Sequence, residues 1–407
     1  MVELLFFVLG VIIFVGFFSL RFFEETGIPD VIFLMLVGAL LGATFVVDKT
    51  FFNEMTPYFG ALALIMILFE GGLHLNISKV LNELYTASSF TITAFALSAF
   101  VVMNSVHYIF GWEYSHALLL GTVLGGTSSA VVIMLISRIR GLSQDTKTIL
   151  SLESAITDAL CILVTLTTVQ VLMFQSASVQ ELSGDLIGAF SIAIVLGVFF
   201  SLAWGGMFLK HFHGRSFAYL LTIGVIFIMY STTEFLKGNG AIAVLTFGLV
   251  LGNYSSIAKA FRVEHNISLE GIIKQFHSEI SLLIRTFFFI YLGLIFNWRD
   301  LSVQIVMISV TVLAVLMLVR IAVVKLLINK DKSLKNYEVV LTSMMPRGLA
   351  AAVLASAPLS AGLIIPSIQE IVTLTIISTT VVATLGSYMY TRAAGTPAAN
   401  GSRKPAN

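Results

Sequence analysis

The segment Ser151-Leu-Glu-Ser-Ala-Ile-Thr-Asp158 places two carboxylates inside an apolar run that extends from about residue 148 to residue 174. A single helix needs about 20 residues to cross the hydrocarbon core of a bilayer, so this run is long enough. A charge at membrane depth costs at least about 2.5–3.5 kcal/mol and usually marks a pathway for ions or protons. We interpret Asp158 as the only aspartate deep inside an apolar segment, and therefore as a candidate site for a cation or a proton.

The composition of the whole chain is that of a polytopic membrane protein. Of its 407 residues, 57% are hydrophobic and only 11% are charged, and the mean hydropathy is +0.98. Soluble domains carry about 25% charged residues. The net charge of +1 does not indicate a nucleic-acid partner. The single cysteine, Cys161, excludes a disulfide within the chain and a cysteine-cluster metal site, and its apolar surroundings indicate a packing role.

Apolar runs separated by polar or Gly/Pro-rich breaks predict an all-α chain with about thirteen transmembrane helices. The runs are too long and too uniformly apolar for the strands of a membrane barrel. The expected spans are 4–20, 28–47, 57–75, 85–110, 114–137, 147–174, 186–209, 216–236, 239–254, 277–296, 301–328, 337–359 and 366–391. The N-terminus lacks the basic region of a signal peptide, so we expect the first span to be retained.

The distribution of Lys and Arg predicts the orientation of the chain. With thirteen spans, 17 of the 23 cationic residues fall on the side that holds the C-terminus, and 3 fall on the opposite side. The remaining three lie within spans. Because cytoplasmic loops carry an excess of Lys and Arg, we expect the N-terminus outside the cell and the C-terminus in the cytoplasm.

Short glycine motifs suggest an internal repeat. Gly38-Ala-Leu-Leu-Gly42 of the second span has a counterpart in Gly248-Leu-Val-Leu-Gly252 of the ninth. Likewise, Glu70-Gly-Gly-Leu73 of the third span resembles Tyr291-Leu-Gly-Leu294 of the tenth. The alternative is that such motifs recur because Gly-x-x-x-Gly is common in membrane helices.

The repeat hypothesis divides the chain into regions. Residues 1–392 form the transmembrane part, in which two six-helix repeats of opposite orientation, about 1–174 and 216–391, flank a linker helix at 186–209. Inverted repeats of this kind are the plan of many secondary transporters. The segment 393–407 is rich in Ala, Gly, Pro, Ser and Asn, and we expect it to be a disordered cytoplasmic tail.

Two spans at equivalent places in the proposed repeats look interrupted. The fifth contains Gly125-Gly-Thr-Ser-Ser129, and the twelfth contains Pro346-Arg-Gly348 followed by Pro358. Paired broken helices point to the midplane site of a transporter, because their exposed carbonyls and N–H groups can hold ions. The alternative for each span is a helix that small residues merely bend.

Six ionisable residues fall well inside the spans, and their formal charges cancel: Glu70, Glu153, Asp158, Arg285, Arg320 and Arg347. With a helix rise of about 1.5 Å per residue, Glu153 lies about 9 Å and Asp158 about 16 Å from the cytoplasmic end of the sixth span. In this topology all six charges lie at the midplane or in the cytoplasmic half. A funnel that opens to the cytoplasm and narrows to Asp158 accounts for this distribution.

Helical phase separates the two carboxylates of the sixth span. Glu153 lies five residues before Asp158 and so about 140° around the helix. We therefore expect Glu153 to form a structural ion pair with Arg320, which lies at a matching depth, with Arg347 as the alternative partner. Ser154 lies one turn before Asp158 on the same face and can offer a hydroxyl oxygen to an ion.

Other oxygen-bearing side chains are candidates for the same site. Thr157 neighbours Asp158 and can tune it, and Glu70 is either an ion ligand or a charge that lines the funnel. Burial disfavours the ionised carboxylate, so protons can compete with a metal ion at Asp158. Oxygen ligands of this kind suit hard ions such as Na⁺ or K⁺.

Taken together, these motifs make the chain resemble the monovalent cation/proton antiporter superfamily, most closely the NhaP-like Na⁺/H⁺ antiporters, with some Kef-like features. Four segments carry the resemblance: Thr26-Gly-Ile-Pro-Asp-Val-Ile-Phe-Leu-Met-Leu-Val-Gly-Ala-Leu-Leu-Gly42, Leu68-Phe-Glu-Gly-Gly-Leu73, Glu153-Ser-Ala-Ile-Thr-Asp158 and Pro346-Arg-Gly-Leu-Ala-Ala-Ala-Val353. They are similar to the family's second-helix signature, its Phe-Glu-x-Gly-Leu segment, its Glu-Ser-x-x-Asn-Asp motif and the Arg-Gly segment of its second broken helix.

The resemblance implies a homodimer in the cell membrane, with a dimerisation domain and a mobile core domain that carries crossing broken helices 5 and 12. It implies that Asp158 binds cation and proton alternately, with Ser154, the Thr127 backbone and Glu70 nearby as the metal site. It also implies a structural Glu153–Arg320 pair and an elevator-like movement. No cofactor is expected beyond the transported ions.

Two departures from the family pattern bear on which ion is transported. The family's Asn-Asp is Thr157-Asp158 here, and its Thr-Asp-Pro is Thr127-Ser128-Ser129, which resembles the Kef-like branch that handles K⁺. One carboxylate at the crossing suggests electroneutral 1:1 exchange. We expect Na⁺ or Li⁺ exchange for H⁺, with K⁺/H⁺ exchange as the alternative.

Two other classes of function fit the sequence less well. A channel-like K⁺ efflux system would need a selectivity filter, and no such motif is present. An intramembrane aspartyl protease would need two facing aspartates, whereas Asp158 stands alone at depth. We therefore do not expect an enzyme.

Overall fold

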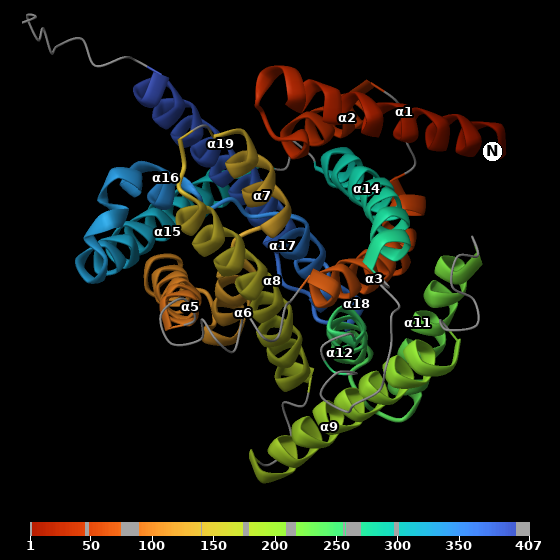
Figure 1. Cartoon of the computed structure of the whole chain (residues 1–407). Helices are drawn as coiled ribbons and strands as arrows, with labels where there is room; N and C mark the ends of the chain where they lie inside the picture. The colour runs from red at the N-terminus through yellow and green to blue at the C-terminus, as the bar shows by residue number, and fades with distance from the viewer. Residues whose placement is uncertain are drawn as a thin grey trace, which may run out of the picture.

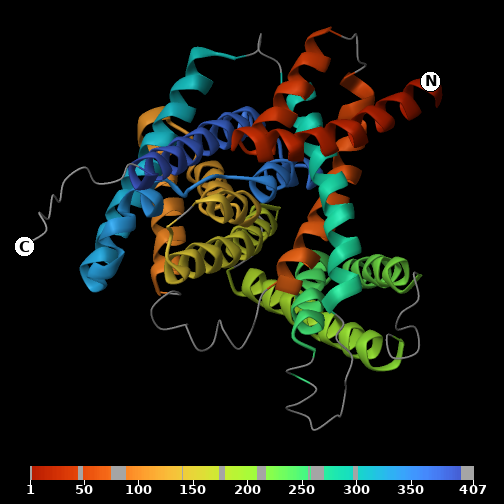
Figure 2. The same cartoon turned by 45° about the horizontal axis from the view of Figure 1, so that its top comes forward.

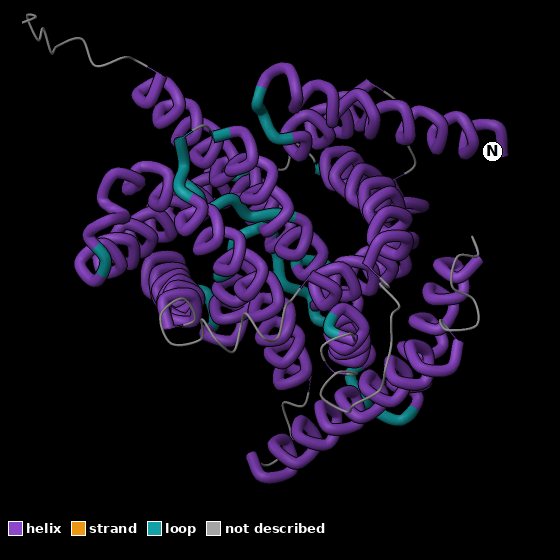
Figure 3. The backbone as a smooth tube through the Cα atoms, viewed as in Figure 1, coloured by secondary structure: helices purple, strands orange, loops and turns teal. Residues whose placement is uncertain are grey.

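A computed structural model of the chain describes residues 2–44, 49–74, 89–139, 141–173, 179–208, 217–254, 257, 270–296 and 301–395. Within these residues the secondary structure is entirely helical, as Figure 3 shows. The prediction of an all-α chain is confirmed for this part of the protein.

Within the described residues, six helical segments, one of them interrupted, are long and apolar enough to cross a membrane, judged by length and composition. They cover Thr91–Phe110, Tyr114–Arg138, Gln144–Met173, Ile187–Gly206, Val303–Lys330 and Ile368–Arg392. Further apolar helices of 10–17 residues accompany them. The chain is thus a membrane protein with multiple spans.

The helices form two groups, which lie on opposite sides of the view in Figure 1. In Figure 2 the N-terminal helices of one group cross in front of the C-terminal helix of the other. We call the first the crossing group: α5 (Ser89–Phe110), α6 (Tyr114–Leu124), α7 (Ser129–Arg138), α8 (Gln144–Met173), α15 (Val303–Lys330), α16 (Glu338–Ser343), α17 (Leu349–Leu354), α18 (Ala357–Ser360) and α19 (Ile368–Gly395). A 3-10 helix, Lys332–Tyr337, joins α15 to α16.

We call the second the scaffold group: α1 (Val2–Thr26), α2 (Asp30–Thr44), α3 (Lys49–His74), α9 (Val179–Ala203) with the π-helical turn Trp204–Phe208, α11 (Phe217–Phe235), α12 (Gly240–Gly252) and α14 (Glu270–Ile295). Helices pack extensively within each group. Between the groups the contacts are sparse and involve mainly α3 with α8, α17 and α18.

Several hydroxyls within the long helices bond to the preceding turn of their own helix. The Thr167 hydroxyl donates to the carbonyl of Leu163 at 2.7 Å, and the Thr233 hydroxyl donates to the carbonyl of Met229 at 2.7 Å. In an environment without water, such bonds to the preceding turn remove the cost of an unpaired hydroxyl. Threonines can therefore sit inside apolar helices without a partner on another helix.

Two pairs of scaffold helices approach backbone to backbone through glycine. Gly38 and Gly42 of α2 face the carbonyls of Ile290 and Leu294 on α14, and a Cβ on Gly42 would lie 2.6 Å from the Leu294 oxygen. The space between these helices therefore admits no side chain at these positions. Gly293 of α14 faces α2 in return.

The second pair, α3 and α12, also packs through glycines that face the backbone of the partner helix. A Cβ on Gly248 of α12 would lie 2.6 Å from the carbonyl oxygen of Phe69 on α3, and Gly252 faces the Leu73 backbone. Gly72 of α3 faces α12 in return. The glycine motifs of the second and ninth spans are thus the contact surfaces of two matching helix pairs.

Both spans that contain glycine or proline breaks are interrupted. α6 ends at Leu124 and α7 begins at Ser129, while α16 ends at Ser343 and α17 begins at Leu349. The intervening residues are non-helical stretches inside the bundle (Figure 3). Gly126 fits one of them closely, since a Cβ there would lie 2.6 Å from the Thr157 carbonyl oxygen.

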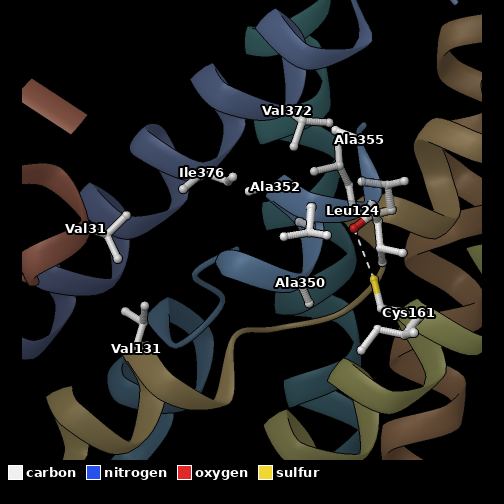
Figure 4. Packing of buried hydrophobic residues seen from close by; sticks show 14 of the residues in the cluster. Val31, Leu124, Val131, Cys161, Ala350, Ala352, Ala355, Val372 and Ile376 are labelled. Carbon is white, nitrogen blue, oxygen red and sulfur yellow. Dashed lines mark hydrogen bonds between the residues drawn. The ribbon is translucent and has the colours of Figure 1, made fainter. Parts of the chain in front are cut away.

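Small residues let the helices close around these breaks. Ala350 and Ala352 of α17 are 6% and 2% exposed, and Cys161 of α8 is 2% exposed. Figure 4 shows Cys161 in this core with Leu124 of α6 nearby. The Cys161 thiol donates to the carbonyl oxygen of Val123 at 3.1 Å, which is consistent with the packing role expected of it.

Some boundaries differ from the sequence-based expectation by several residues. α19 continues to Gly395, so residues 393–395 are helical rather than part of the tail, and residues 396–407 lie outside the described residues. Parts of the loops whose Lys and Arg residues predict the orientation also lie outside them.

Candidate functional site

The two interrupted helices meet at their breaks. The backbone N–H of Ser128 donates to the carbonyl oxygen of Pro346 at 2.8 Å, which joins the two non-helical stretches directly. Thr127, Ser128 and Arg347 are each no more than 5% exposed. The crossing therefore lies in the interior of the crossing group, and it exposes helix ends there.

Each break is anchored by a threonine of a neighbouring helix. The N–H of Thr127 donates to Oγ1 of Thr157 on α8 at 3.1 Å, and the two hydroxyls lie 3.1 Å apart. At the second break, the N–H of Arg347 donates to Oγ1 of Thr379 on α19 at 3.0 Å. Thr157 thus holds the backbone beside Asp158, and Thr379 does the same for the other break.

Asp158 faces the N-terminus of α7. Its Oδ2 accepts a hydrogen bond from the Ser129 hydroxyl at 2.6 Å and one from the Ser129 N–H at 2.9 Å. The residue is half-buried. Among the described residues both donors go to Oδ2, so Oδ1 is left for a ligand or a proton.

Ser129 is a site residue that the sequence-based predictions do not include. Ser129 belongs to the first break, but its side chain has no role in the site expected from the sequence. The available signal was its position: it follows two glycines and starts an apolar helical run, where orphan N–H groups and the helix dipole attract a carboxylate. Sequence spacing alone does not bring Asp158, 29 residues later in the chain, to this helix start.

Arg347 lies at the end of α6. Its Nε donates to the carbonyl oxygen of Leu124 at 2.8 Å, and its Nη1 donates to the carbonyl oxygen of Met345 at 2.7 Å. Both carbonyls belong to residues at or near the ends of interrupted helices, where carbonyls lack partners in the helix. The guanidinium therefore places a positive charge where the helix dipole is negative.

Glu153 and Arg320 form a buried ion pair across α8 and α15. Both terminal nitrogens of Arg320 contact the carboxylate, with Nη2 at 2.9 Å from Oε2 and Nη1 on Oε1. The Arg320 Nε donates to the carbonyl oxygen of Leu341 at 2.8 Å. Both side chains are nearly inaccessible to solvent, so the pair compensates two charges that would otherwise be costly.

Two further residues expected as ion ligands, Ser154 and Glu70, lie on α8 and α3. Ser154 is fully buried, and its hydroxyl donates to the carbonyl oxygen of Ser151 at 3.1 Å, so its lone pairs are available to a cation. Glu70 is half-buried on α3, the scaffold helix that contacts α8, and it acts electrostatically on Asp158.

Arg285 lies outside this site. Its Nη2 is 2.8 Å from Oδ2 of Asp30, the first residue of α2, and Asp30 is fully buried. The structure therefore contains a second buried aspartate, which lies at the start of a helix and not deep inside an apolar segment. Asp30 resembles an ordinary acidic residue at a helix start, and its burial depends on packing against α14.

A cavity of about 10 Å³ adjoins the crossing. Its lining includes Thr127, Glu153, Thr157, Arg320 and Arg347. A cavity of this size is at the lower limit for holding one water molecule. Asp158 is not in its lining. Within the described residues no cluster of three or more His, Cys, Asp or Glu side chains could hold a metal ion. The site instead combines one carboxylate with hydroxyl and carbonyl oxygens, ligands that suit a hard cation.

The chain matches the model of one protein family, described as "Sodium/hydrogen exchanger, transmembrane", over residues 9–390. The K(+)/H(+) antiporter NhaP2 of Shewanella sp. (strain ANA-3) is 27% identical over 284 residues, which are 68% of this chain and 47% of that protein. The Na(+)/H(+) antiporter ApNhaP of Aphanothece halophytica is 25% identical over 309 residues, 73% of this chain and 55% of that protein. The chain spans about half the length of these curated relatives.

The fold is similar to that of a solved structure, the sodium proton antiporter MjNhaP1 from Methanocaldococcus jannaschii at pH 8. The TM-score is 0.75, the sequence identity is 22%, and the match covers 97% of each chain. This likeness concerns the arrangement of helices. Since the family model spans nearly all of the described helices, the chain belongs to the sodium/hydrogen exchanger family.

Proposed function

We propose that the protein exchanges a monovalent cation for a proton across the membrane, and that the two compete for Asp158. The observation that carries this proposal is the position of the carboxylate. It lies half-buried beside the crossing of two interrupted helices, with two donors on Oδ2 and none from the described residues on Oδ1. A charge in a membrane interior is costly, and such residues usually serve ion or proton movement.

The proposed mechanism follows from the chemistry of one carboxylate. Oδ1 accepts either a cation or a proton, and each neutralises the same single negative charge. The loaded site therefore carries the same charge in both directions, which makes 1:1 exchange electroneutral. Alternating access would then move Asp158 between the two sides only when it is neutralised, because moving the bare charge is costly.

Several oxygens are placed to complete the cation site. We propose Ser154, the Thr127 backbone and Glu70 as further ligands, with Thr157 holding the backbone and Ser128 joining the crossing. The Ser154 hydroxyl supports this role, because it donates to its own helix and keeps its lone pairs free. Glu153 and Arg320 would support the structure around the site and would not be part of the ion pathway.

Na⁺ or Li⁺ is the first candidate for the transported ion, on the resemblance of the Glu70 and Asp158 motifs to Na⁺/H⁺ antiporters. K⁺ is the second candidate. Two observations favour it: the segment Thr127-Ser128-Ser129 lacks an acidic residue, and a relative that is 27% identical is a K⁺/H⁺ antiporter. A channel-like K⁺ efflux system is less consistent with a carboxylate that both substrates must neutralise.

The proposed architecture is two inverted repeats within thirteen spans. The α2–α14 and α3–α12 contacts support it, because the glycine motifs that match in sequence occupy the same place in two helix pairs. The bonds from Thr127 N–H to Thr157 and from Arg347 N–H to Thr379 support it too. Each repeat then supplies one broken helix and one threonine that anchors it.

Sparse contacts between the two helix groups support an elevator-like movement of the crossing group. In this proposal the scaffold group forms the interface of a homodimer in the cell membrane, with the N-terminus outside and the C-terminus in the cytoplasm. Crosslinking within the membrane and accessibility of terminal tags test these two points separately from transport.

Reconstituted protein tests the proposed function. Proteoliposomes with an internal pH dye should show proton flux driven by a Na⁺, Li⁺ or K⁺ gradient, and Asp158→Asn should abolish it while the protein stays folded. Flux driven only by K⁺ would make K⁺ the transported ion. In a further experiment a Na⁺ gradient drives the flux, while a K⁺ ionophore sets the membrane voltage. A change of the flux with this voltage would exclude electroneutral exchange. Wild-type rates in the Asp158→Asn variant would exclude the mechanism.

A further inference from the structure

We infer that Ser129 is a positioning residue that sets the competition between cation and proton at Asp158. It would do so by holding Oδ2 of the carboxylate at the N-terminus of α7, which confines both competitors to Oδ1. This inference rests on the proposed antiport at Asp158 and adds a residue that controls its pH dependence.

Ser129 makes two hydrogen bonds to the Asp158 carboxylate, and one of them is short. One residue supplies both donors, the hydroxyl at 2.6 Å and the backbone N–H at 2.9 Å, and both converge on Oδ2. An O–H···O⁻ bond of about 2.5–2.7 Å is characteristic of an ionised acceptor and is stronger than a neutral hydrogen bond. Since the N–H is part of the backbone, the carboxylate is tied to the position of the helix itself.

The start of α7 leaves its first N–H without a helical partner. Ser129 is the first residue of this ten-residue helix, and the preceding Ser128 makes no side-chain cap. The orphan N–H therefore goes to Asp158, and the positive end of the helix dipole lies near the carboxylate. The break in the helix thus serves Asp158 directly, because an uninterrupted helix would have used this N–H internally.

Other charges around Asp158 do not replace this contact. In the described part of the chain, the titratable and charged groups near it are Glu70 on α3, Cys161 on α8 and Arg347 before α17, and Glu153 and Arg320 lie in turn near Arg347. Arg320 is paired with Glu153, the Arg347 guanidinium donates to backbone carbonyls, and the Cys161 thiol donates to carbonyls of α6. Direct hydrogen bonds to the carboxylate therefore come from Ser129.

Occupation of Oδ2 has a consequence for binding. A proton and a cation both need a lone pair of the carboxylate, and two donors already occupy Oδ2. Both substrates then have to use Oδ1, so their binding is mutually exclusive at one atom. The donors also stabilise the ionised form relative to the protonated form, so they favour the cation over the proton.

Substitutions at Ser129 separate the two donors. Ser129→Ala removes the hydroxyl and keeps the N–H. Ser129→Pro removes both, and proline is well tolerated at the first position of a helix. Ser129→Thr keeps both donors. Ser137→Ala is the matched control, because Ser137 lies on the same helix, is exposed, and donates only to the carbonyl oxygen of Met134.

The experiment measures exchange in proteoliposomes between pH 6 and pH 9 over a series of Na⁺ and K⁺ concentrations. Without a donor the proton competes better, so deprotonation needs a higher pH. For Ser129→Ala we expect the half-maximal pH to rise by about one unit and the apparent KM near neutral pH to rise about tenfold, the size expected for one hydrogen bond to a charged group. Ser129→Pro should shift further, and Ser129→Thr should restore the wild-type profile.

The KM at alkaline pH shows whether proton competition causes the change in Ser129→Ala. If Ser129 acts on proton competition, the KM of Ser129→Ala should approach the wild-type value as pH rises, whereas a purely structural defect would lower the rate at every pH. Burial of the Cys161 thiol, measured with a maleimide before and after denaturation, verifies that each variant is folded.

Two results would overturn the inference. One is a Ser129→Ala profile that superimposes on those of the wild type and Ser137→Ala; the other is a Ser129→Thr profile that stays shifted with Ser129→Ala. These results are distinct from failure of the proposed function, which would appear as a wild-type protein without exchange or as an Asp158→Asn variant that retains it.

Discussion

The guanidinium of Arg320 covers both carboxylate oxygens of Glu153 while its Nε donates to the carbonyl of Leu341. One arginine thereby connects α15, α8 and α16, three helices of the crossing group. The pair holds α8 from the face opposite the Asp158 contact to α7. Its integrity therefore affects the position of Asp158 without contact with an ion.

Removal of one partner of this pair should be costly. Arg320→Ala would leave Glu153 charged and buried, and we expect a loss of about 3–5 kcal/mol in the free energy of unfolding. Glu153→Leu with Arg320→Met should recover most of it, because an apolar pair of similar volume avoids the buried charge. Thermal unfolding in detergent measures both. Equal stabilities for wild type and Arg320→Ala would show that the pair is not needed for folding.

Gly348 should tolerate no side chain at the crossing. A Cβ at this position would collide with the side chain of Ser128. We expect Gly348→Ala to cost about 1–3 kcal/mol through overpacking and to slow exchange. Ser128→Gly in the same chain should relieve the collision, as a double-mutant cycle on stability would measure.

The control for this substitution is Gly224→Ala in α11, where a Cβ would meet nothing within 4 Å. There the change should be neutral or stabilising by up to about 1 kcal/mol, because alanine is the better helix former. A loss of stability for Gly224→Ala as large as that for Gly348→Ala would contradict the steric argument.

The Asp30–Arg285 pair should stabilise the scaffold group and leave the ion site unchanged. Asp30 is fully buried at the start of α2, with the Arg285 Nη2 2.8 Å away. We expect Arg285→Ala to lower the free energy of unfolding by about 3–5 kcal/mol, since it strands a buried charge. Addition of Asp30→Asn should recover part of the loss. An altered cation KM in folded Arg285→Ala protein would indicate a role in the ion pathway instead.

Arg138 should govern the rate of exchange. At the end of α7 its guanidinium donates to the carbonyls of Phe23 and Glu24 at the end of α1, and it lies 5.0 Å from the centre of the Phe23 ring. These contacts join the crossing group to the scaffold group, so an elevator-like movement has to break them.

We therefore expect Arg138→Ala to raise turnover roughly threefold to tenfold, the equivalent of about one hydrogen bond, with little change in the cation KM. Arg138→Lys keeps the charge without the fork of donors, and it should lie between wild type and Arg138→Ala. Initial rates at saturating cation measure this effect. Unchanged turnover in Arg138→Ala would mean that the contact persists throughout the cycle.

Helical phase was a sufficient guide to the two faces of α8. The spacing between Glu153 and Asp158 predicts different faces, and in the structure one residue meets α15 and the other meets α7. The same holds for the helical class and for the two interruptions, because glycine and proline act on the backbone at their own positions. Local rules were enough for these features.

Features that depend on contacts between distant segments were not predictable in this way. The role of Ser129 follows from the direction of α7 after the break, and that direction depends on the bond between Ser128 and Pro346. The burial of Asp30 depends on the packing of α2 against α14, where Gly38 and Gly293 let the backbones meet. Propensity and periodicity describe one helix at a time and contain neither relationship.

The arginine at the crossing has a consequence for biogenesis. Arg347 reaches the carbonyl of Leu124 across 223 residues of sequence, and Arg320 reaches Glu153 across 167. While the chain is being inserted, α6 and α8 enter the bilayer long before either arginine has been synthesised. Until then, in lipid or in the insertion machinery, the Leu124 end of α6 lacks its arginine and Glu153 lacks its ion-pair partner. The charge balance of the site is a property of the finished chain alone.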